Sequence, residues 1–414
     1  MKNRSFFSPV GKKFFLGMAI ILSSITLSCG DDNDRIKPIP PKEPTHTLFM
    51  YMPWSSNLTS FFKINIADMS DAIATGMFKN ERVLVFFATS STKASLFELV
   101  YKATDGTCEQ KILKEYENHP CTTAEGITEI LNEVKQLAPA DKYSMTIGGH
   151  GMGWLPVNKT KALPFESSTS HSSAPLYHWE AQGDYLTRYF GGTSPNHQTE
   201  ITTLAQAIEN AGIVMEYILF DDCYMSNVEV AYDLRHVTRH FIASTSEVMA
   251  YGMPYHLLAE HMLGEVDYEG ISQTFYDFYM NYSMPCGTIA MTVTSELDSL
   301  ATLMREINTR YTWDEDLTSD LQALDGYNPH LFYDYRDYVA NLCADSVLLS
   351  RFDEQLLRTV PLASCKHTPT YYSALNNRQT SIERFCGLTI SEPSTHYLAD
   401  PKEETNWYKA THVE

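Results

Sequence analysis

Between residues 47 and 243, short apolar runs alternate with segments that carry apolar residues at helical spacing. Continuous runs such as 82–88 and 215–220 are typical of strands whose two faces are both buried. Segments such as 60–77 and 200–211 fit amphipathic helices. This alternation predicts an α/β fold with a mostly parallel sheet and helices on both faces. Further strands are expected at 47–52, 95–101, 143–147 and 240–243, and further helices at 122–137 and 226–236.

Two stretches depart from this pattern. Residues 155–199 are rich in Ser, Thr, Pro, Gly and His, and a loop of this length is usually functional or disordered. After Ser295, helical spacing comes first and weaker strand patterns follow. We therefore expect one domain over 46–295, with 155–199 as a variable loop, and a smaller C-terminal α+β unit over 296–414. In that unit helices are expected near 297–310, 331–342, 349–359 and 403–411, and weak strands at 370–390.

Residues 1–28 are interpreted as a secretion signal rather than as part of the fold. Four basic residues precede the apolar stretch 14–27, which is too short for a comfortable membrane span. The stretch stops at Cys29, which resembles the acylated cysteine of bacterial lipoproteins, so we expect a lipid anchor to a membrane there. The alternative is an ordinary cleaved signal with an incidental cysteine.

Residues 29–45 are expected to be a linker. Its four prolines favour an extended, semi-rigid spacer. The acidic run at 31–34 resembles the surface-export signal of Bacteroidetes lipoproteins, which implies the outer membrane or cell surface as the location. A solvated linker on a periplasm-facing protein is the alternative.

Composition restricts the function without naming one. The chain has 414 residues, 43% hydrophobic and 20% charged, as in a folded protein rather than a disordered, fibrous or multi-pass membrane one. Its net charge of −20 argues against binding to nucleic acid. Without residues 1–28, 27 Lys and Arg face 51 Asp and Glu, which gives −24. A surface of this charge attracts basic peptide segments.

Two predicted strand ends carry residues suited to catalysis. After 143–147 the sequence reads GGHGMGW, in which His150 stands among glycines whose backbone can approach a ligand closely. After 215–220 it reads DDCYM, with Cys223 just before a predicted helix. Because the carboxyl ends of parallel strands share one edge of a sheet, we expect this histidine and this cysteine to meet there as base and nucleophile.

Each segment also has a plainer interpretation. His150 could occupy a tight turn, and Cys223 could be a buried structural cysteine. A helix N-terminus and a neighbouring histidine would favour the thiolate, whereas the two adjacent acids would disfavour it. The two residue types at equivalent strand ends favour catalysis. A zinc site at His236 and His240 has little support, because no glutamate adjoins them as in a zinc peptidase.

The two motifs together, HGMGW at 150–154 and DDCYM at 221–225, resemble the clostripain family of cysteine peptidases. The resemblance covers 46–295 and extends more weakly to 407–411. It implies a caspase-like sheet, peptide or protein substrates with basic residues, and no resident cofactor. Calcium dependence is known in the family, but the sequence holds no EF-hand-type loop that supports it. A monomer is expected.

The resemblance also implies roles for individual residues. Cys223 would be the nucleophile and His150 the general base and acid. The backbone N–H groups of Gly151 and Cys223 would form the oxyanion hole. Asp221 would line the pocket for a basic side chain, with Arg or Lys before the cut. Glu247 is a candidate second acid of that pocket, and Asp222 is interpreted as a helix cap.

Departures from the family pattern affect substrate choice rather than the dyad. Tyr224 replaces the usual leucine after the cysteine, and Met253 stands where better-studied members have tryptophan. Members of the family are often matured by self-cleavage between the histidine and the cysteine. Lys159, Lys161 and Arg188 lie in the 155–199 loop, and the bond between Lys161 and Ala162 is the favoured candidate.

Two functions from different classes remain open. The first is an endopeptidase with Arg or Lys before the scissile bond. The second is a catalytically weak or inactive surface lipoprotein that binds peptides or glycans on the same fold. The presence of both His150 and Cys223 favours the endopeptidase.

Overall fold

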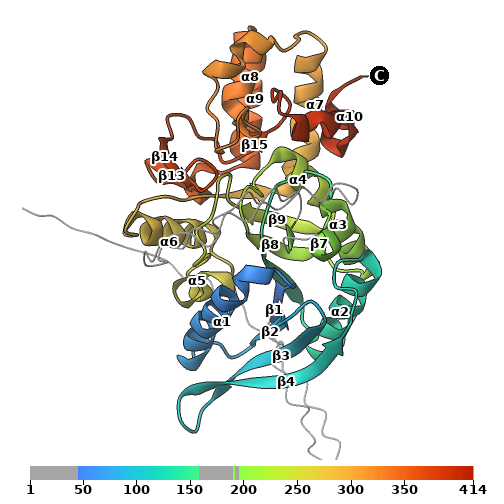
Figure 1. Cartoon of the computed structure of the whole chain (residues 1–414), viewed down its shortest axis with the longest axis vertical. Helices are drawn as coiled ribbons and strands as arrows, with labels where there is room; N and C mark the ends of the chain where they lie inside the picture. Colours follow the sequence, from blue (N-terminus) through green and yellow to red (C-terminus); the bar gives the residue numbers. More distant parts are fainter. Residues whose placement is uncertain (1–44, 158–189, 192–194, 414) are drawn as a thin grey trace, which may run out of the picture. The chain divides into compact units, whose positions relative to one another are not determined.

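A computed structural model describes residues 45–157, 190–191 and 195–413, all within one compact unit, 43–414. At its centre is a nine-stranded sheet with the order β12-β10-β9-β8-β5-β1-β2-β3-β4 (Figure 1). The five central strands, from β9 to β2, are parallel, and two antiparallel strands extend the sheet at each side. The strands are β1 (His46–Met52), β2 (Glu81–Ala88), β3 (Lys93–Lys102), β4 (Thr107–Glu117), β5 (Lys142–Gly148), β8 (Met215–Asp221), β9 (Thr238–Ala243), β10 (Thr288–Val293) and β12 (Cys365–His367).

Helices cover both faces of the sheet because its central strands are apolar on both sides. In β1, Leu48 and Met50 join the core on one face, whereas Phe49 and Tyr51 join the core on the other. The first face is covered by α1 (Thr59–Ala74), α5 (Tyr255–Met262) and α6 (Tyr268–Met280). The second is covered by α2 (Ala124–Leu137), α3 (Ile201–Asn210), α4 (Val228–Leu234) and α7 (Leu297–Asn308). This is the predicted fold class.

Several elements of the sheet and its covering helices were not predicted. The edge strand β4 is mostly exposed, so its sequence shows no apolar run, and nothing was predicted there. Helices α5 and α6 and strand β10 were also not predicted. Short elements complete this part of the chain: η1 (Ser56–Leu58), β6 (Phe190–Gly191), η2 (Pro195–His197), β7 (Gln198–Thr199) and η3 (Thr294–Glu296).

The segment after Ser295 shares the core of the sheet. Strand β12 pairs with β10, and Trp407 lies in the same apolar cluster as Phe49. The expected domain border at 295/296 therefore marks a change in the sequence pattern, and the residues on its two sides share one continuous core. The segment contains η4 (Glu315–Asp320), β11 (Tyr333–Asp334), α8 (Tyr335–Leu342), α9 (Ser346–Thr359), η5 (Leu362–Ser364), β13 (Thr370–Ser373), β14 (Arg378–Ser381), β15 (Thr389–Ile390), η6 (Tyr397–Glu404) and α10 (Asn406–Thr411).

Several predictions concern residues outside this description. The secretion signal, Cys29, residues 29–44 of the linker and the bond between Lys161 and Ala162 lie outside the described residues. Within the described residues, every helix is too short or too polar to cross a bilayer.

We expect Trp407→Ala to destabilise the whole unit. Trp407 is 1% exposed and makes edge-to-face contacts with Tyr232 of α4 (5.4 Å between ring centroids) and Tyr335 of α8 (5.9 Å). Removal of a buried tryptophan costs about 3–5 kcal/mol of unfolding free energy. Chemical denaturation followed by circular dichroism measures it. The control is Val347→Ala in α9, where the valine is 71% exposed and a change below about 0.5 kcal/mol is expected. Equal stabilities of the two variants would contradict a shared core.

Candidate active site

The register of two central strands brings the predicted catalytic residues together. Strands β5 and β8 are parallel neighbours, and Gly148 pairs with Asp221 at their carboxyl ends. His150 and Cys223 each follow two residues after this pair, so both lie at the same edge of the sheet. The prediction that the two strand ends lie side by side is confirmed.

Gly151 fits against the backbone of Cys223. A Cβ atom at Gly151 would fall 2.1 Å from the carbonyl oxygen of Cys223 and 2.9 Å from its nitrogen. Real Cβ contacts are never this short, so only glycine allows the two loops to approach so closely. The His150 loop is held from the other side by its backbone N–H, which donates to the carbonyl of Gly191 in β6 (3.1 Å).

His150 has a partner that the sequence did not indicate. Its Nε2 lies 2.8 Å from Oδ1 of Asn57, in the short helix η1 after β1. Because an amide oxygen only accepts, Nε2 carries the hydrogen and Nδ1 carries the lone pair. Burial lowers the pKa of His150 to about 4, so its imidazole is neutral near pH 7. A neutral imidazole with its lone pair on Nδ1 can accept a proton.

The Cys223 thiol is half-buried, and the segment after β9 encloses it. The backbone N–H of Val248 donates to Sγ (3.3 Å), and a donor at this position stabilises a thiolate more than a thiol. The next residue, Tyr224, has φ +56°, a left-handed conformation that is rare for a bulky side chain. Such a conformation persists only where the surroundings hold it.

The helix that was expected to begin just after Cys223 starts further along the chain, too far away for its terminus to stabilise a thiolate there. Helix α4 starts at Val228 and its N-cap is Asn227, so the interpretation of Asp222 as a helix cap is wrong. The field of a helix terminus falls off within one turn and does not reach Cys223. Residues between Cys223 and the helix instead form an irregular turn, pinned where the Tyr224 N–H donates to the Ser246 carbonyl (3.0 Å) and the Ser226 N–H to the Ser244 carbonyl (2.8 Å).

Asp221 is a buried acid that faces the loop after β9. Its side chain accepts from the backbone N–H of Met253 (3.0 Å) and is 8% exposed. A Cβ at Gly252 would lie 2.4 Å from Oδ1 of Asp221, so glycine lets the loop close over the carboxylate. Burial raises the pKa of Asp221 to about 7. The acid therefore changes charge near neutral pH.

Asp222 faces the loop that carries His150, since a Cβ atom at Gly149 would lie 3.3 Å from its Oδ1. It is 1% exposed. Burial, and then the charge of Asp221, raise its pKa well above the usual range. Two adjacent buried acids thus disfavour further negative charge next to Cys223.

Glu247 connects the turn that follows Cys223 to the C-terminal segment. Its carboxylate accepts hydrogen bonds from the hydroxyls of Tyr224 and Ser373 and from the backbone N–H of Ala374 (2.9 Å). Burial raises its pKa to about 7. The structure therefore places this predicted pocket acid at a junction of three chain segments.

Aromatic contacts reinforce this junction. The ring of Tyr224 stacks on Phe332, with centroids 5.4 Å apart, and both rings are buried. On the other loop, Nε1 of Trp154 donates to Oγ of Ser391 (2.8 Å). Residues after 296 therefore support both the histidine loop and the cysteine turn.

No group of three or more His, Cys, Asp or Glu side chains with metal-binding geometry occurs among the described residues. His236 lies in a turn after α4 and His240 in β9, so these two histidines share no helix face.

Comparisons with known proteins agree with this geometry. Residues 177–361 match the profile of the clostripain family, Peptidase_C11. Across 90% of this chain and 100% of the other, the chain is 53% identical to the secreted C11 cysteine protease iotapain from Bacteroides thetaiotaomicron, with a TM-score of 0.80. No curated protein matches the sequence.

Two further solved structures are similar. A clostripain from Bacteroides thetaiotaomicron in complex with the peptide inhibitor BTN-VLTK-AOMK is 60% identical, over 55% of this chain and 100% of that chain, with a TM-score of 0.54. An inactive zymogen C11 protease from Parabacteroides distasonis is 26% identical, over 90% of this chain and 99% of that chain, with a TM-score of 0.72.

We expect Gly151→Ala to lower peptidase activity by about 100-fold, because the added methyl must displace Cys223, and a displacement of about 1 Å costs this much. The measurement is kcat/KM on a fluorogenic peptide. The control is Gly106→Asn, since nothing lies within 4 Å of a Cβ there and asparagine tolerates its φ of +69°. Full activity of Gly151→Ala would contradict the close approach of the two loops.

Proposed function

The chain belongs to the clostripain family of cysteine peptidases, and on this premise we propose that it is a secreted, lipid-anchored endopeptidase that cuts after a basic residue through Cys223 and His150. The observation that carries the proposal is the pairing of Gly148 with Asp221, which sets the two reactive side chains at one edge of the sheet. Peptides are the proposed substrates, which the peptide inhibitor bound to the 60% identical relative supports.

The proposed reaction starts from a neutral pair of side chains. The Cys223 sulfur attacks the scissile carbonyl carbon while its proton moves to Nδ1 of His150. The C–N bond then breaks, and the leaving amine takes that proton from the imidazole. Water attacks the resulting thioester with His150 as base, which releases the acid product and restores the thiol. Asn57 keeps the imidazole in the tautomer that this sequence of steps needs.

The oxyanion is proposed to form between the two loops. The backbone N–H groups of Gly151 and Cys223 are the candidate donors, and their chain segments touch at Gly151. Backbone donors of this kind act on the charge that appears in the transition state, and each contributes about 100-fold or more in rate.

Asp221 is the acid that we propose for the pocket of the basic side chain. It lies two residues before the nucleophile and is nearly buried, so an ammonium or guanidinium group would meet it out of water. The inhibitor bound by the 60% identical relative ends in lysine before its AOMK group, which supports a basic residue at this position. Glu247 already receives three hydrogen bonds, so we assign it to the support of the cysteine turn.

The anchor and the maturation step rest on the sequence. We propose acylation at Cys29, with the protein at the outer membrane or cell surface, and self-cleavage between Lys161 and Ala162. The relative with 53% identity is described as secreted, which supports an extracellular or surface location.

A second candidate is a surface lipoprotein that binds peptides or glycans without turnover. The raised pKa values of Asp221 and Asp222 favour this candidate, because two buried acids oppose a thiolate. The contact of the two loops at Gly151 favours the enzyme, because it holds His150 and Cys223 at one edge of the sheet.

Cys223→Ala separates the two candidates. Wild-type protein should be labelled by a biotinylated Lys-AOMK probe and should yield two chains on a denaturing gel, since a cut after Lys161 leaves two fragments. The Cys223→Ala protein should show neither. Labelling is read by streptavidin blot, and the cut by N-terminal sequencing, with Cys108→Ala as the matched control at a half-buried cysteine on β4. Wild-type protein that stays intact and unlabelled would support the binder.

The pH dependence should identify Asp221 as the pocket acid. A lysine side chain pairs with the carboxylate, and the carboxyl is protonated below its pKa of about 7. For a substrate with lysine before the cut, kcat/KM should therefore rise with pH to a plateau above about 7. The titration of His150, with a pKa of about 4, does not change kcat/KM in this pH range. In Asp221→Asn, kcat/KM should fall by about 100-fold and lose this rise. A preserved rise in the variant would assign it to another group.

A further inference from the structure

A cavity of about 210 Å³ opens at the same edge of the sheet as the proposed active site. It lies where β1 and β2 end, where β3 begins and where β4 ends, and Pro53, Trp54 and Ala88 line it from the parallel strands. The parallel strands run in one direction, so all of their carboxyl ends lie at the edge that also carries His150 and Cys223. The cavity and the proposed dyad thus lie along the same edge of the sheet.

The order of the strands gives the direction of a bound peptide. Along this edge the strands run β9-β8-β5-β1-β2, so the features follow as Asp221 and Cys223, then His150, then Asn57, then the cavity. Asp221 is the proposed site of the residue before the cut, and His150 gives its proton to the leaving amine. The chain after the cut therefore runs from His150 toward β1 and β2.

The distances agree with a short stretch of peptide. Neighbouring strands lie about 4.8 Å apart, so the ends of β1 and β2 are about 5–10 Å beyond that of β5. An extended peptide advances about 3.3 Å per residue. The second or third residue after the cut, P2′ or P3′, therefore reaches the cavity.

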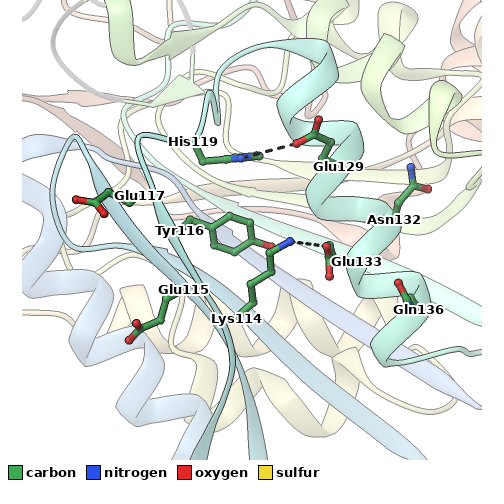
Figure 2. A pocket seen from close by; sticks show the side chains of 9 residues that line it. All are labelled: Lys114, Glu115, Tyr116, Glu117, His119, Glu129, Asn132, Glu133 and Gln136. Carbon is green, nitrogen blue, oxygen red and sulfur yellow. Dashed lines mark hydrogen bonds and ion pairs between the residues drawn. The ribbon is translucent and has the colours of Figure 1, made fainter.

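The lining indicates the kind of side chain. Trp54, Ala88, Ala94 and Tyr116 supply an apolar wall on one side, whereas hydroxyl, amide and imidazole groups line much of the rest. None of the described residues that line the cavity is Asp or Glu. The neighbouring groove in Figure 2 differs in this respect, since four glutamates line it between β4 and α2. Lys93, exposed at the rim of the cavity, is the one Lys or Arg among the described residues that line it.

The wall at Tyr116 is held in place from behind. Lys114 lies over its ring at 5.0 Å from the centroid and pairs with Glu133, and the ring of His119 is 5.0 Å away (Figure 2). Phe86 packs on it from the sheet, at 5.4 Å between centroids. A wall fixed in this way exists before a ligand arrives, which lowers the entropy that binding costs.

We propose that this cavity is a subsite for a large apolar side chain at P2′ or P3′ of the substrate. The inference rests on the proposed function, because it takes the direction of the peptide from Asp221 and His150. It makes the enzyme selective on both sides of the cut, with a charge before it and an apolar side chain after it.

The test uses two substrate types that share the same residues up to a lysine before the cut. One ends there in an aminocoumarin amide, and the other continues with three residues in a quenched fluorescent peptide, with Phe, Ala or Glu at P2′ and P3′. Wild-type kcat/KM should favour Phe over Ala by about tenfold, equivalent to about 1.4 kcal/mol. In Trp54→Ala, and in Ser91→Trp, which fills the cavity from an exposed rim position, this ratio should fall to about one.

The outcomes separate the inference from the proposed function. Absence of coumarin release by wild-type protein would overturn the proposed function. Coumarin release with equal rates for Phe and Ala, or with Glu preferred to Phe, would overturn the apolar subsite. A tenfold ratio that survives in both variants would place the subsite elsewhere. Tyr101→Ala, at the opposite end of β3 and 39% exposed, is the control that should keep the wild-type ratio.

Discussion

The parallel register between β5 and β8 is the constraint on which the site depends. Both strands are buried on their two faces, so a slip of one residue would turn every apolar side chain to the wrong core and is excluded. With Gly148 opposite Asp221, His150 and Cys223 can only follow side by side. Gly151 then lets the two loops touch without a Cβ between them. The packing of the sheet thus sets the positions of His150 and Cys223, although neither residue belongs to a strand.

The C-terminal segment maintains what the sheet positions. Tyr224 keeps a left-handed backbone that costs about 1–3 kcal/mol for a residue of its kind. Its stacking on Phe332 and its hydrogen bond to Glu247 offset that cost, and both partners are themselves buried. Phe332, Ser373 and Ser391 all come from the segment after Ser295. The turn after Cys223 and the loop after His150 therefore depend on residues far away in sequence.

The sequence predicts those parts of the fold and the site that leave a hydrophobic pattern or a motif along the chain. The parallel strands were predicted correctly because burial on both faces produces an apolar run. His150 and Cys223 were predicted as a dyad because a histidine among glycines and a cysteine follow two such runs, and the pairing of β5 with β8 brings those two strand ends together. Strand β4 left no such signal, because a mostly exposed edge strand does not need a run of apolar residues. Asn57 was missed because its role arises from the neighbouring position of β1 and β5, which the sequence order does not show. Asp222 was assigned to a helix that begins only at Val228, since the turn between them is held by contacts with the segment after β9.

The electrostatics of the site suit a cationic substrate. Asp221 and Asp222 are buried directly before Cys223 in the chain, and burial raises the pKa of both carboxyls, so negative charge is disfavoured there. In the proposed function, a lysine or arginine side chain that enters the pocket brings a positive charge beside Asp221. The carboxylate is then favoured, and the same charge favours the thiolate of Cys223 close by. A neutral side chain would leave the acids protonated and the thiol without this help. A basic residue would therefore be selected through the reactivity of Cys223 as well as through binding. The positive charge that pairs with Asp221 in the pocket also stabilises the thiolate of Cys223 in this proposal.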